Sequence, residues 1–149
     1  MDYSNKNIVF IIANITLSAG TERAVVNTAN NFINNGNNVT IISLYSDSGD
    51  AYYKLKDSVK IIHHAAKINS NLLSRLTDYW KIAKNINKYF CGGEYVIGTT
   101  HAINCMMTFL SKRKKLELIG CEHMGYGAAP RITRIIRKYL YPKLDALVV

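Results

Sequence analysis

The sequence predicts an α/β domain with a doubly wound, mostly parallel sheet flanked by helices. Six short apolar runs recur along the 149 residues, and most are rich in β-branched residues and nearly continuous. Such runs are typical of strands buried on both faces, as in parallel sheets. Amphipathic stretches separate most of the runs, and this alternation favours right-handed crossovers. The length suits one domain with one hydrophobic core.

The predicted strands occupy residues 8–12, 39–44, 59–62, 95–97, 116–119 and 146–149. Helices are predicted over about 25–33, 71–90, 102–110 and 130–141, and residues 45–56 are predicted to form a loop. Gly36 stands where a C-terminal glycine of the first helix belongs, and Leu76 falls on the apolar stripe of the second. Pro130 favours the start of the last helix and Pro142 its end. The inward stripe predicted for that helix comprises Ile132, Ile135, Ile136, Tyr139 and Leu140.

The composition is that of an ordinary globular protein, with 48% apolar and 19% charged residues. No apolar run approaches the ~20 residues that span a bilayer, and the N-terminus lacks the pattern of a secretory signal. The cysteines Cys91, Cys105 and Cys121 are odd in number and show no CxxC pairing. We therefore expect reduced thiols in a cytoplasmic protein, without a disulfide framework or a zinc site.

The formal charge of +9 is unevenly distributed. The first fifty residues carry two bases and four acids, whereas the other ninety-nine carry seventeen bases and six acids. This bias is compatible with a lysine-rich solvated surface, and equally with an anionic partner such as a membrane or a phosphorylated substrate. A nucleic-acid binder is disfavoured, because no helix-turn-helix or RNA-binding aromatic motif is present.

Ligands of doubly wound sheets bind beyond the carboxyl ends of the strands, so the loops there are the candidate site. The first such loop, LSAGTER at 17–23, contains Gly20, Thr21 and Glu22. Its small residues let a ligand approach the backbone, and the free N–H groups of the following helix attract anions. Ser18 or Thr21 is expected to cap that helix. The loop matches neither GxGxxG nor a P-loop, which disfavours both sites.

Two further loops carry polar side chains after predicted strands. In GTTHAIN at 98–104, His101 and Asn104 lie one turn apart and suit contacts to a hydroxyl or phosphate, although a capping or packing role explains His101 equally simply. In GCEHMGYG at 120–127, Glu122 and His123 directly follow a strand. Adjacent residues of an extended segment point to opposite sides, so only one of the two is expected to face the cleft.

Two other clusters have simpler structural explanations. His63 and His64 face apart and lack further metal ligands, so a metal site is not expected there. On the last helix, Arg131, Arg134, Arg137 and Lys138 form the predicted polar face. That face is either solvated or, through Arg131, Arg134 and Lys138, a patch for anionic head groups or a pyrophosphate.

With these motifs in order, the sequence resembles the N-terminal domain of family 4 retaining glycosyltransferases of the two-domain GT-B type, and in particular the bacterial transferases of capsule and exopolysaccharide. The similar segments are IVFIIANITLSAGTERAVVNTANNFINNGNNVTIISL, GTTHAIN, CEHMGYG and LDALVV. The resemblance covers nearly the whole chain and is strongest over residues 8–44 and 96–149 and weakest over 45–90. Two positions depart from the family pattern, because Ala19 replaces a glycine and Asn38 replaces a histidine, and neither change removes the backbone N–H groups of the loop.

The resemblance implies a Rossmann-like fold over residues 1–149 that holds the acceptor, a saccharide or lipid-linked molecule in cell-envelope polysaccharide synthesis. A C-terminal domain, which this chain lacks, would hold the nucleotide-sugar, so the chain alone is expected to be inactive. The resemblance implies no cofactor and no metal, and it fits a cytoplasmic protein at the inner face of the membrane.

The same resemblance implies roles for single residues. Backbone N–H groups of Gly20 and Thr21 would bind the donor diphosphate or the acceptor, with Glu22 beside them. His123 would face the reacting sugar, and Glu122 would position the acceptor or its loop. The acceptor pocket would also be lined by His101 and Asn104. No protein nucleophile is assigned.

One alternative from another class remains at this point. A non-catalytic α/β domain that binds a nucleotide or a protein would keep the fold without requiring His101, Glu122 and His123 to converge. The last predicted strand ends at Val149, which favours a piece of a larger enzyme over a complete domain.

Overall fold

The computed structural model describes residues 5–67, 72–110, 112–122 and 130–149, and it confirms the predicted α/β class. The strands are β1 (Asn7–Ile12), β2 (Asn38–Ser43), β3 (Lys60–His63), β4 (Tyr95–Gly98), β5 (Glu117–Cys121) and β6 (Ala146–Val148). The helices are α1 (Gly20–Asn34), α2 (Leu72–Ile86), α3 (His101–Met107) and α4 (Arg131–Leu140). Short 3₁₀ turns occupy Asn87–Tyr89, Lys112–Lys114 and Tyr141–Lys143.

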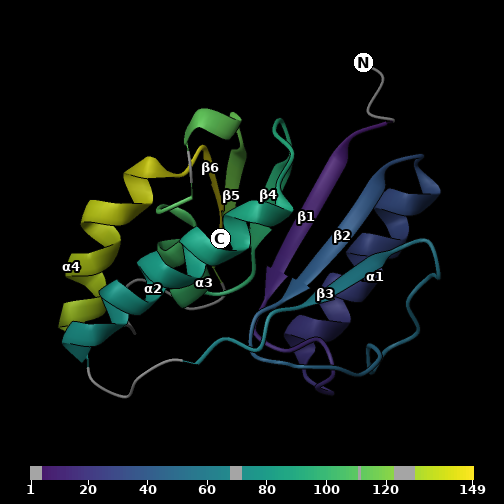
Figure 1. Cartoon of the computed structure of the whole chain (residues 1–149), viewed down its shortest axis with the longest axis horizontal. Coiled ribbons are helices and arrows are strands. Elements are labelled where there is room, and N and C mark those ends of the chain that lie inside the picture. The colour runs from purple at the N-terminus through teal and green to yellow at the C-terminus, as the bar shows by residue number, and fades with distance from the viewer. Residues whose placement is uncertain (1–4, 68–71, 111, 123–129) are drawn as a thin grey trace.

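The strands form one sheet in the order β3-β2-β1-β4-β5-β6, and all neighbouring pairs are parallel (Figure 1). From β1 the chain first adds strands on one side and then returns to add β4, β5 and β6 on the other. The order therefore reverses between β1 and β4, which is where sheets of this type bind ligands. Because every pair is parallel, the carboxyl ends of all six strands lie along one edge.

Both faces of the central strands are buried, which explains their nearly continuous apolar runs. Within β1, Val9 and Ile11 belong to the core that includes buried residues of α2 and α3. The alternate residues Ile8, Phe10 and Ile12 belong to the core under α1. A strand packed on both sides needs apolar residues at consecutive positions rather than at alternate ones.

Of the two predictions about the ends of α1, the C-terminal one is confirmed and the N-terminal one is wrong. Gly36 follows the helix with a φ of 77° and donates its N–H to Ile33 O at 3.0 Å, so the predicted C-terminal glycine is confirmed. The predicted cap by Ser18 or Thr21 is wrong, because the N-cap residue is Ala19 and no side chain caps the helix. The helix therefore begins without the side-chain hydroxyl that usually accepts a backbone N–H group at this position.

The inward stripe predicted for α4 is wrong in part. Leu140 is buried, but Ile132, Ile135 and Tyr139 are exposed, the last by 70%. Arg137, predicted to lie on the polar face, is only 3% exposed. The helix is therefore rotated relative to its apolar pattern, because Arg137 turns toward the sheet. On α2, Leu76 is likewise exposed rather than inward.

Candidate functional site at the carboxyl edge of the sheet

The first predicted loop places its residues at the N-terminus of α1. Gly20 borders open space, since a Cβ added there would meet no atom within 4 Å. Thr21 is half-buried, and Glu22 is only 5% exposed. The Oε2 atom of Glu22 is buried and makes no hydrogen bond within the part of the chain that is described. An uncapped helix start with a buried carboxylate beside it can bind a group that both accepts and donates hydrogen bonds.

The second predicted loop joins β4 to α3. Thr100 caps α3 by accepting the N–H of Ile103, so the histidine that follows is not needed as a cap. His101 is half-buried. Burial lowers its pKa below the usual 6.5, the positive charge of Arg137 lowers this pKa further, and the carboxylate of Glu122 opposes the shift. His101 therefore lies in the field of both charges and is neutral at physiological pH.

Asn104 is buried completely between two strand ends. Its Nδ2 donates to the carbonyl of Cys121 at 2.9 Å, which ties α3 to the end of β5. Gly98 and Gly120 leave room for it, because a Cβ at Gly98 would collide with Asn104 Oδ1 and one at Gly120 would lie only 3.1 Å from Asn104 Cγ. The Oδ1 atom of Asn104 has no partner in the described residues. In this geometry Asn104 supports the backbone of the site.

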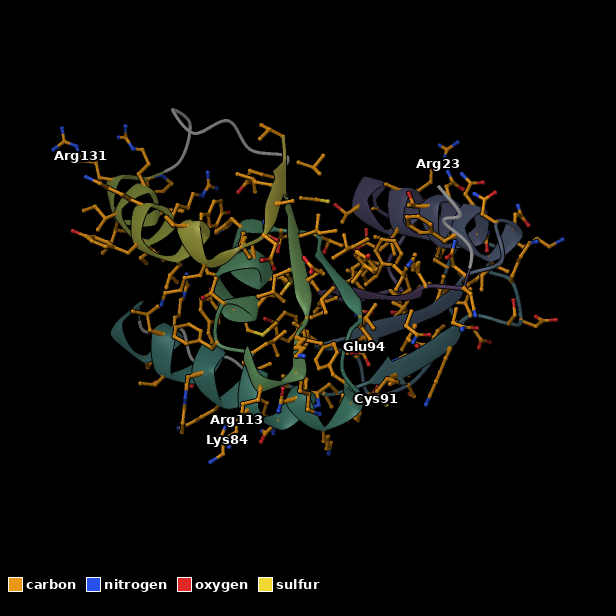
Figure 2. The ribbon with its side chains drawn as sticks, turned by 90° about the horizontal axis from the view of Figure 1, so that it is seen from above. Arg23, Lys84, Cys91, Glu94, Arg113 and Arg131 are labelled. Carbon is orange, nitrogen blue, oxygen red and sulfur yellow. The ribbon has the colours of Figure 1, made fainter. Side chains whose placement is uncertain are left out.

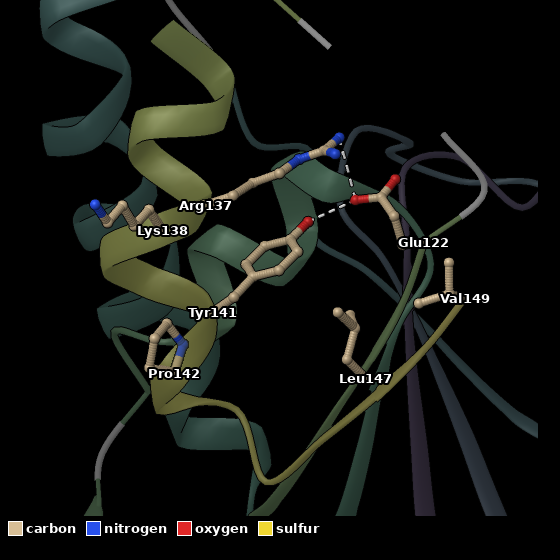
Figure 3. A pocket seen from close by; sticks show the side chains of 7 residues that line it. All are labelled: Glu122, Arg137, Lys138, Tyr141, Pro142, Leu147 and Val149. Carbon is tan, nitrogen blue, oxygen red and sulfur yellow. Dashed lines mark hydrogen bonds and ion pairs between the residues drawn. The ribbon is translucent and has the colours of Figure 1, made fainter. Parts of the chain in front are cut away.

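Glu122 is the centre of a buried polar cluster at the end of β5 (Figure 3). Its N–H donates to Val148 O of β6 at 2.8 Å. Its Oε2 accepts the Tyr141 hydroxyl at 2.6 Å and lies 3.2 Å from Nη2 of Arg137. Glu122 and Arg137 are both almost fully buried, so the ion pair is screened little by water. Burial and the hydrogen bond to Glu122 raise the pKa of Tyr141, which keeps its proton on the phenol.

The cluster borders a pocket of about 300 Å³ between α4 and β6. Arg137 and Tyr141 line one side of it, and Glu122, Leu147 and Val149 lie across from them on the strand side (Figure 3). A pocket with an apolar wall and a few fixed polar groups is the usual form of a small-molecule site.

Sequence reasoning missed Arg137 and Tyr141 as members of the site. One signal for them is present in the sequence: Arg137, Leu140 and Tyr141 fall at i, i+3 and i+4, so they share one side of a helix with a buried leucine. The buried carboxylate that Arg137 pairs with lies on another element, and helical periodicity cannot reveal such a partner.

His101 also lines a smaller pocket of about 40 Å³ where α2, α3 and α4 meet. Arg75 and Tyr79 contribute from α2, and Cys105 contributes from α3. Burial raises the pKa of Cys105 to about 11, so its thiol stays protonated and is a poor nucleophile at neutral pH. Because the thiol stays protonated, the groups of this pocket that can bind a ligand are the guanidinium of Arg75 and the neutral imidazole of His101.

The predicted basic patch lies on the outer side of α4. Arg131 and Lys138 are exposed and Arg134 is half-buried. Figure 2 shows Arg131 at the far end of α4, pointing away from the sheet. Since Ile135 and Tyr139 are exposed among these bases, the surface is both basic and apolar. None of the helices in the described residues is long and apolar enough to cross a membrane.

One predicted site residue, His123, lies outside the described residues, which break off between 122 and 130. Of the others, the structure brings His101 and Glu122 near Arg137, and Asn104 lies against Cys121, the residue before Glu122. Gly20, Thr21 and Glu22 lie at the same edge of the sheet, at the start of α1.

The chain is similar to one curated protein over nearly its whole length. It is 30% identical over 151 aligned positions to the GalNAc-α-(1→4)-GalNAc-α-(1→3)-diNAcBac-PP-undecaprenol α-1,4-N-acetyl-D-galactosaminyltransferase of Campylobacter jejuni subsp. jejuni serotype O:2. The alignment covers 95% of this chain but only 39% of that relative. No family model matches the chain. The similarity to a glycosyltransferase thus extends along nearly the whole chain and spans less than half of the relative's length.

Proposed function

We propose that this chain is the acceptor-binding part of a retaining glycosyltransferase of the GT-B type. The full enzyme would transfer a sugar from a nucleotide-sugar to a saccharide or lipid-linked acceptor. The observation that carries the proposal is the similarity to an N-acetylgalactosaminyltransferase whose name gives a saccharide on undecaprenyl diphosphate. The parallel sheet with polar groups at its carboxyl edge supports it, because such edges bind ligands.

In this proposal the nucleotide-sugar binds to a C-terminal domain of the same enzyme, and the chain alone does not turn over substrate. Catalysis needs no metal or cofactor from this part. The leaving diphosphate is stabilised by fixed positive charge and backbone N–H groups, some of them from Gly20 and Thr21 at the uncapped start of α1.

The remaining predicted residues take roles on the acceptor side. His101 contacts an acceptor hydroxyl or phosphate as a neutral imidazole, and Glu22, beside the start of α1, accepts hydrogen bonds from hydroxyl groups. Glu122 acts by position, since its carboxylate is engaged with Arg137 and Tyr141. It fixes the start of the segment that carries His123, which we propose faces the reacting sugar. Asn104 stabilises the same end of β5 through its hydrogen bond to the carbonyl of Cys121.

The basic and apolar side of α4 supports a peripheral place at the membrane. Arg131, Arg134 and Lys138 would attract anionic lipid head groups, and the exposed Ile135 and Tyr139 would enter the interface. An acceptor anchored in the bilayer would then lie within reach of the carboxyl edge.

A transfer assay tests the division of labour. The 149-residue chain is incubated with nucleotide-activated N-acetylgalactosamine and a short-chain polyprenyl diphosphate that carries an N-acetylgalactosamine disaccharide. We expect no turnover, and turnover by this chain alone would refute the proposal that the donor site lies elsewhere. Binding of a nucleotide without any binding of the glycan would favour a non-catalytic nucleotide-binding domain.

A further inference from the structure

A second polar cluster lies at the carboxyl ends of β2 and β3, away from Glu122. The ring of His63 at the end of β3 lies with Nδ1 2.7 Å from Oγ of Ser46. Ser46 donates its hydroxyl to Oγ of Ser43 at the end of β2. Ser43 Oγ also accepts the N–H of Ile15, at 3.0 Å, from the loop that leads to α1. Ser43 and Ser46 are both buried. The cluster thus connects β2, β3 and the loop after β1.

In the Ser46–Ser43 hydrogen bond Ser46 is the donor, and this direction favours one tautomer of His63. A serine hydroxyl has one proton, and that of Ser46 is directed to Ser43. Ser46 therefore faces His63 with a lone pair, and Nδ1 of the histidine carries the proton. In the neutral ring the other nitrogen, Nε2, is then an acceptor.

The Nε2 atom of His63 is accessible. The residue is half-buried, and Nε2 neither makes a hydrogen bond within the described residues nor is counted among their buried unpaired atoms. The neighbouring His64 differs, because its ring packs edge-on against Tyr89 with centroids 6.0 Å apart. His64 is therefore used in packing. His63 is held by the buried Ser46, which bonds to Ser43, and its Nε2 atom is free to bind a ligand.

The hydrogen-bonding capacity of Nε2 of His63 indicates the class of ligand that it can bind. An acceptor nitrogen suits an O–H or N–H donor and offers no proton to a phosphate. No group of three potential metal-ligating side chains lies together in the described part of the chain, so a cation is not favoured. His63 stands at the same edge as the start of α1, to which Ile15 connects it.

We propose that His63 is a saccharide-binding residue, with Nε2 accepting a hydrogen bond from a sugar hydroxyl. Ser43 and Ser46 are positioning residues that fix the tautomer and the ring orientation, as a connected buried network does. The identity of the ligand as a saccharide rests on the proposed function above. The assignment adds β3 to the acceptor site, which otherwise lies on α1, α3, α4 and the end of β5.

Nuclear magnetic resonance tests the tautomer directly. Long-range ¹H–¹⁵N correlations in the 149-residue chain should show His63 protonated at Nδ1 and unprotonated at Nε2. Ser46→Ala should raise the fraction of ring protonated at Nε2, whereas Ser48→Ala, at an exposed serine of the same loop, should leave it unchanged. A wild-type ring protonated at Nε2 would overturn the assignment.

A titration with a soluble N-acetylgalactosamine disaccharide tests the ligand. Loss of one neutral hydrogen bond should weaken binding by His63→Ala about three- to tenfold, and by Ser46→Ala about twofold. The control His64→Ala should stay within about twofold. Wild-type binding with unchanged affinity in His63→Ala would remove His63 from the site while leaving the proposed function intact. No binding by the wild type would instead refute the acceptor function and the ligand assignment with it. Retained amide spectra of each variant show that it is folded.

Discussion

The Tyr141 hydroxyl lies 2.6 Å from Oε2 of Glu122, the same oxygen that pairs with Arg137. One carboxylate oxygen at the end of β5 thereby binds two residues of the chain that follows. This relationship orients α4 against the sheet and explains why an arginine, rather than an isoleucine, faces inward.

Removing the charge of Glu122 should destabilise the fold strongly. Glu122→Gln leaves the buried Arg137 cation without its partner, and we expect a loss of about 3 to 5 kcal/mol in the free energy of unfolding. Tyr141→Phe removes one hydrogen bond to a charged group and should cost about 1 to 2 kcal/mol. Urea unfolding measures both. Tyr139→Phe, at an exposed tyrosine two residues away, is the matched control and should have no effect.

The Glu122→Gln and Arg137→Met changes should not be additive. When both charges are gone, neither is left buried alone, so the double variant should lose less than the two single losses combined. Additive losses would mean that the two side chains do not form a coupled pair.

His101 should make stability fall in mild acid. Its pKa is lowered in the folded state by burial and by Arg137, so the unfolded chain takes up a proton at higher pH than the native chain does. The contribution is complete above about pH 6.5 and is lost as the pH falls through the lower folded pKa. The free energy of unfolding should therefore decrease between pH 7 and 5 more steeply for the wild type than for His101→Gln. Equal slopes would contradict the shift.

The cysteines should differ in reactivity. Cys91 is exposed, whereas Cys105 is buried with its pKa raised to about 11, and burial also raises the pKa of the half-buried Cys121. Because the thiolate is the reactive form, iodoacetamide at neutral pH should modify Cys91 first and Cys105 only after unfolding. Mass spectrometry of peptides over time gives the order, and fast labelling of Cys105 in the folded chain would contradict its burial.

Vesicle binding should depend on the basic side of α4. Replacing Arg131, Arg134 and Lys138 by glutamine should weaken binding to anionic vesicles at least tenfold, at about 1 kcal/mol for each charge near the surface. Co-sedimentation measures the partition. In the control variant, three exposed lysines elsewhere are replaced by glutamine, so that the net charge is the same as in the test variant: Lys54, Lys60 and Lys67. Equal wild-type binding to neutral and anionic vesicles would contradict the role of the patch.

The fold could be predicted from sequence because its signal is local. Strands packed on both faces are written as continuous apolar runs, and the six predicted runs coincide with the six strands within one or two residues. Gly36 marks the end of α1 through its backbone conformation, which few other residues adopt easily.

The parts that could not be predicted depend on partners distant in sequence. Arg137 is buried because Glu122 lies opposite, and this exposes Ile132 and Ile135 at positions that the periodicity places inside. His63 similarly gains a defined orientation from Ser46, seventeen residues earlier, which is itself bonded to Ser43 on the neighbouring strand. Adjacent histidines were predicted to face apart, and they do, toward Ser46 and Tyr89 respectively.

The central claim, that this chain holds the acceptor of a glycosyltransferase, is tested most directly by an equilibrium binding titration. The 149-residue chain is titrated with two compounds in parallel: the diphosphate-linked N-acetylgalactosamine disaccharide and nucleotide-activated N-acetylgalactosamine. We predict that the glycan binds and shifts the amide signals of His101 and Glu122 at the carboxyl edge, and that the nucleotide-sugar binds at least tenfold more weakly. Absence of glycan binding, or binding at the opposite edge of the sheet, would contradict the account.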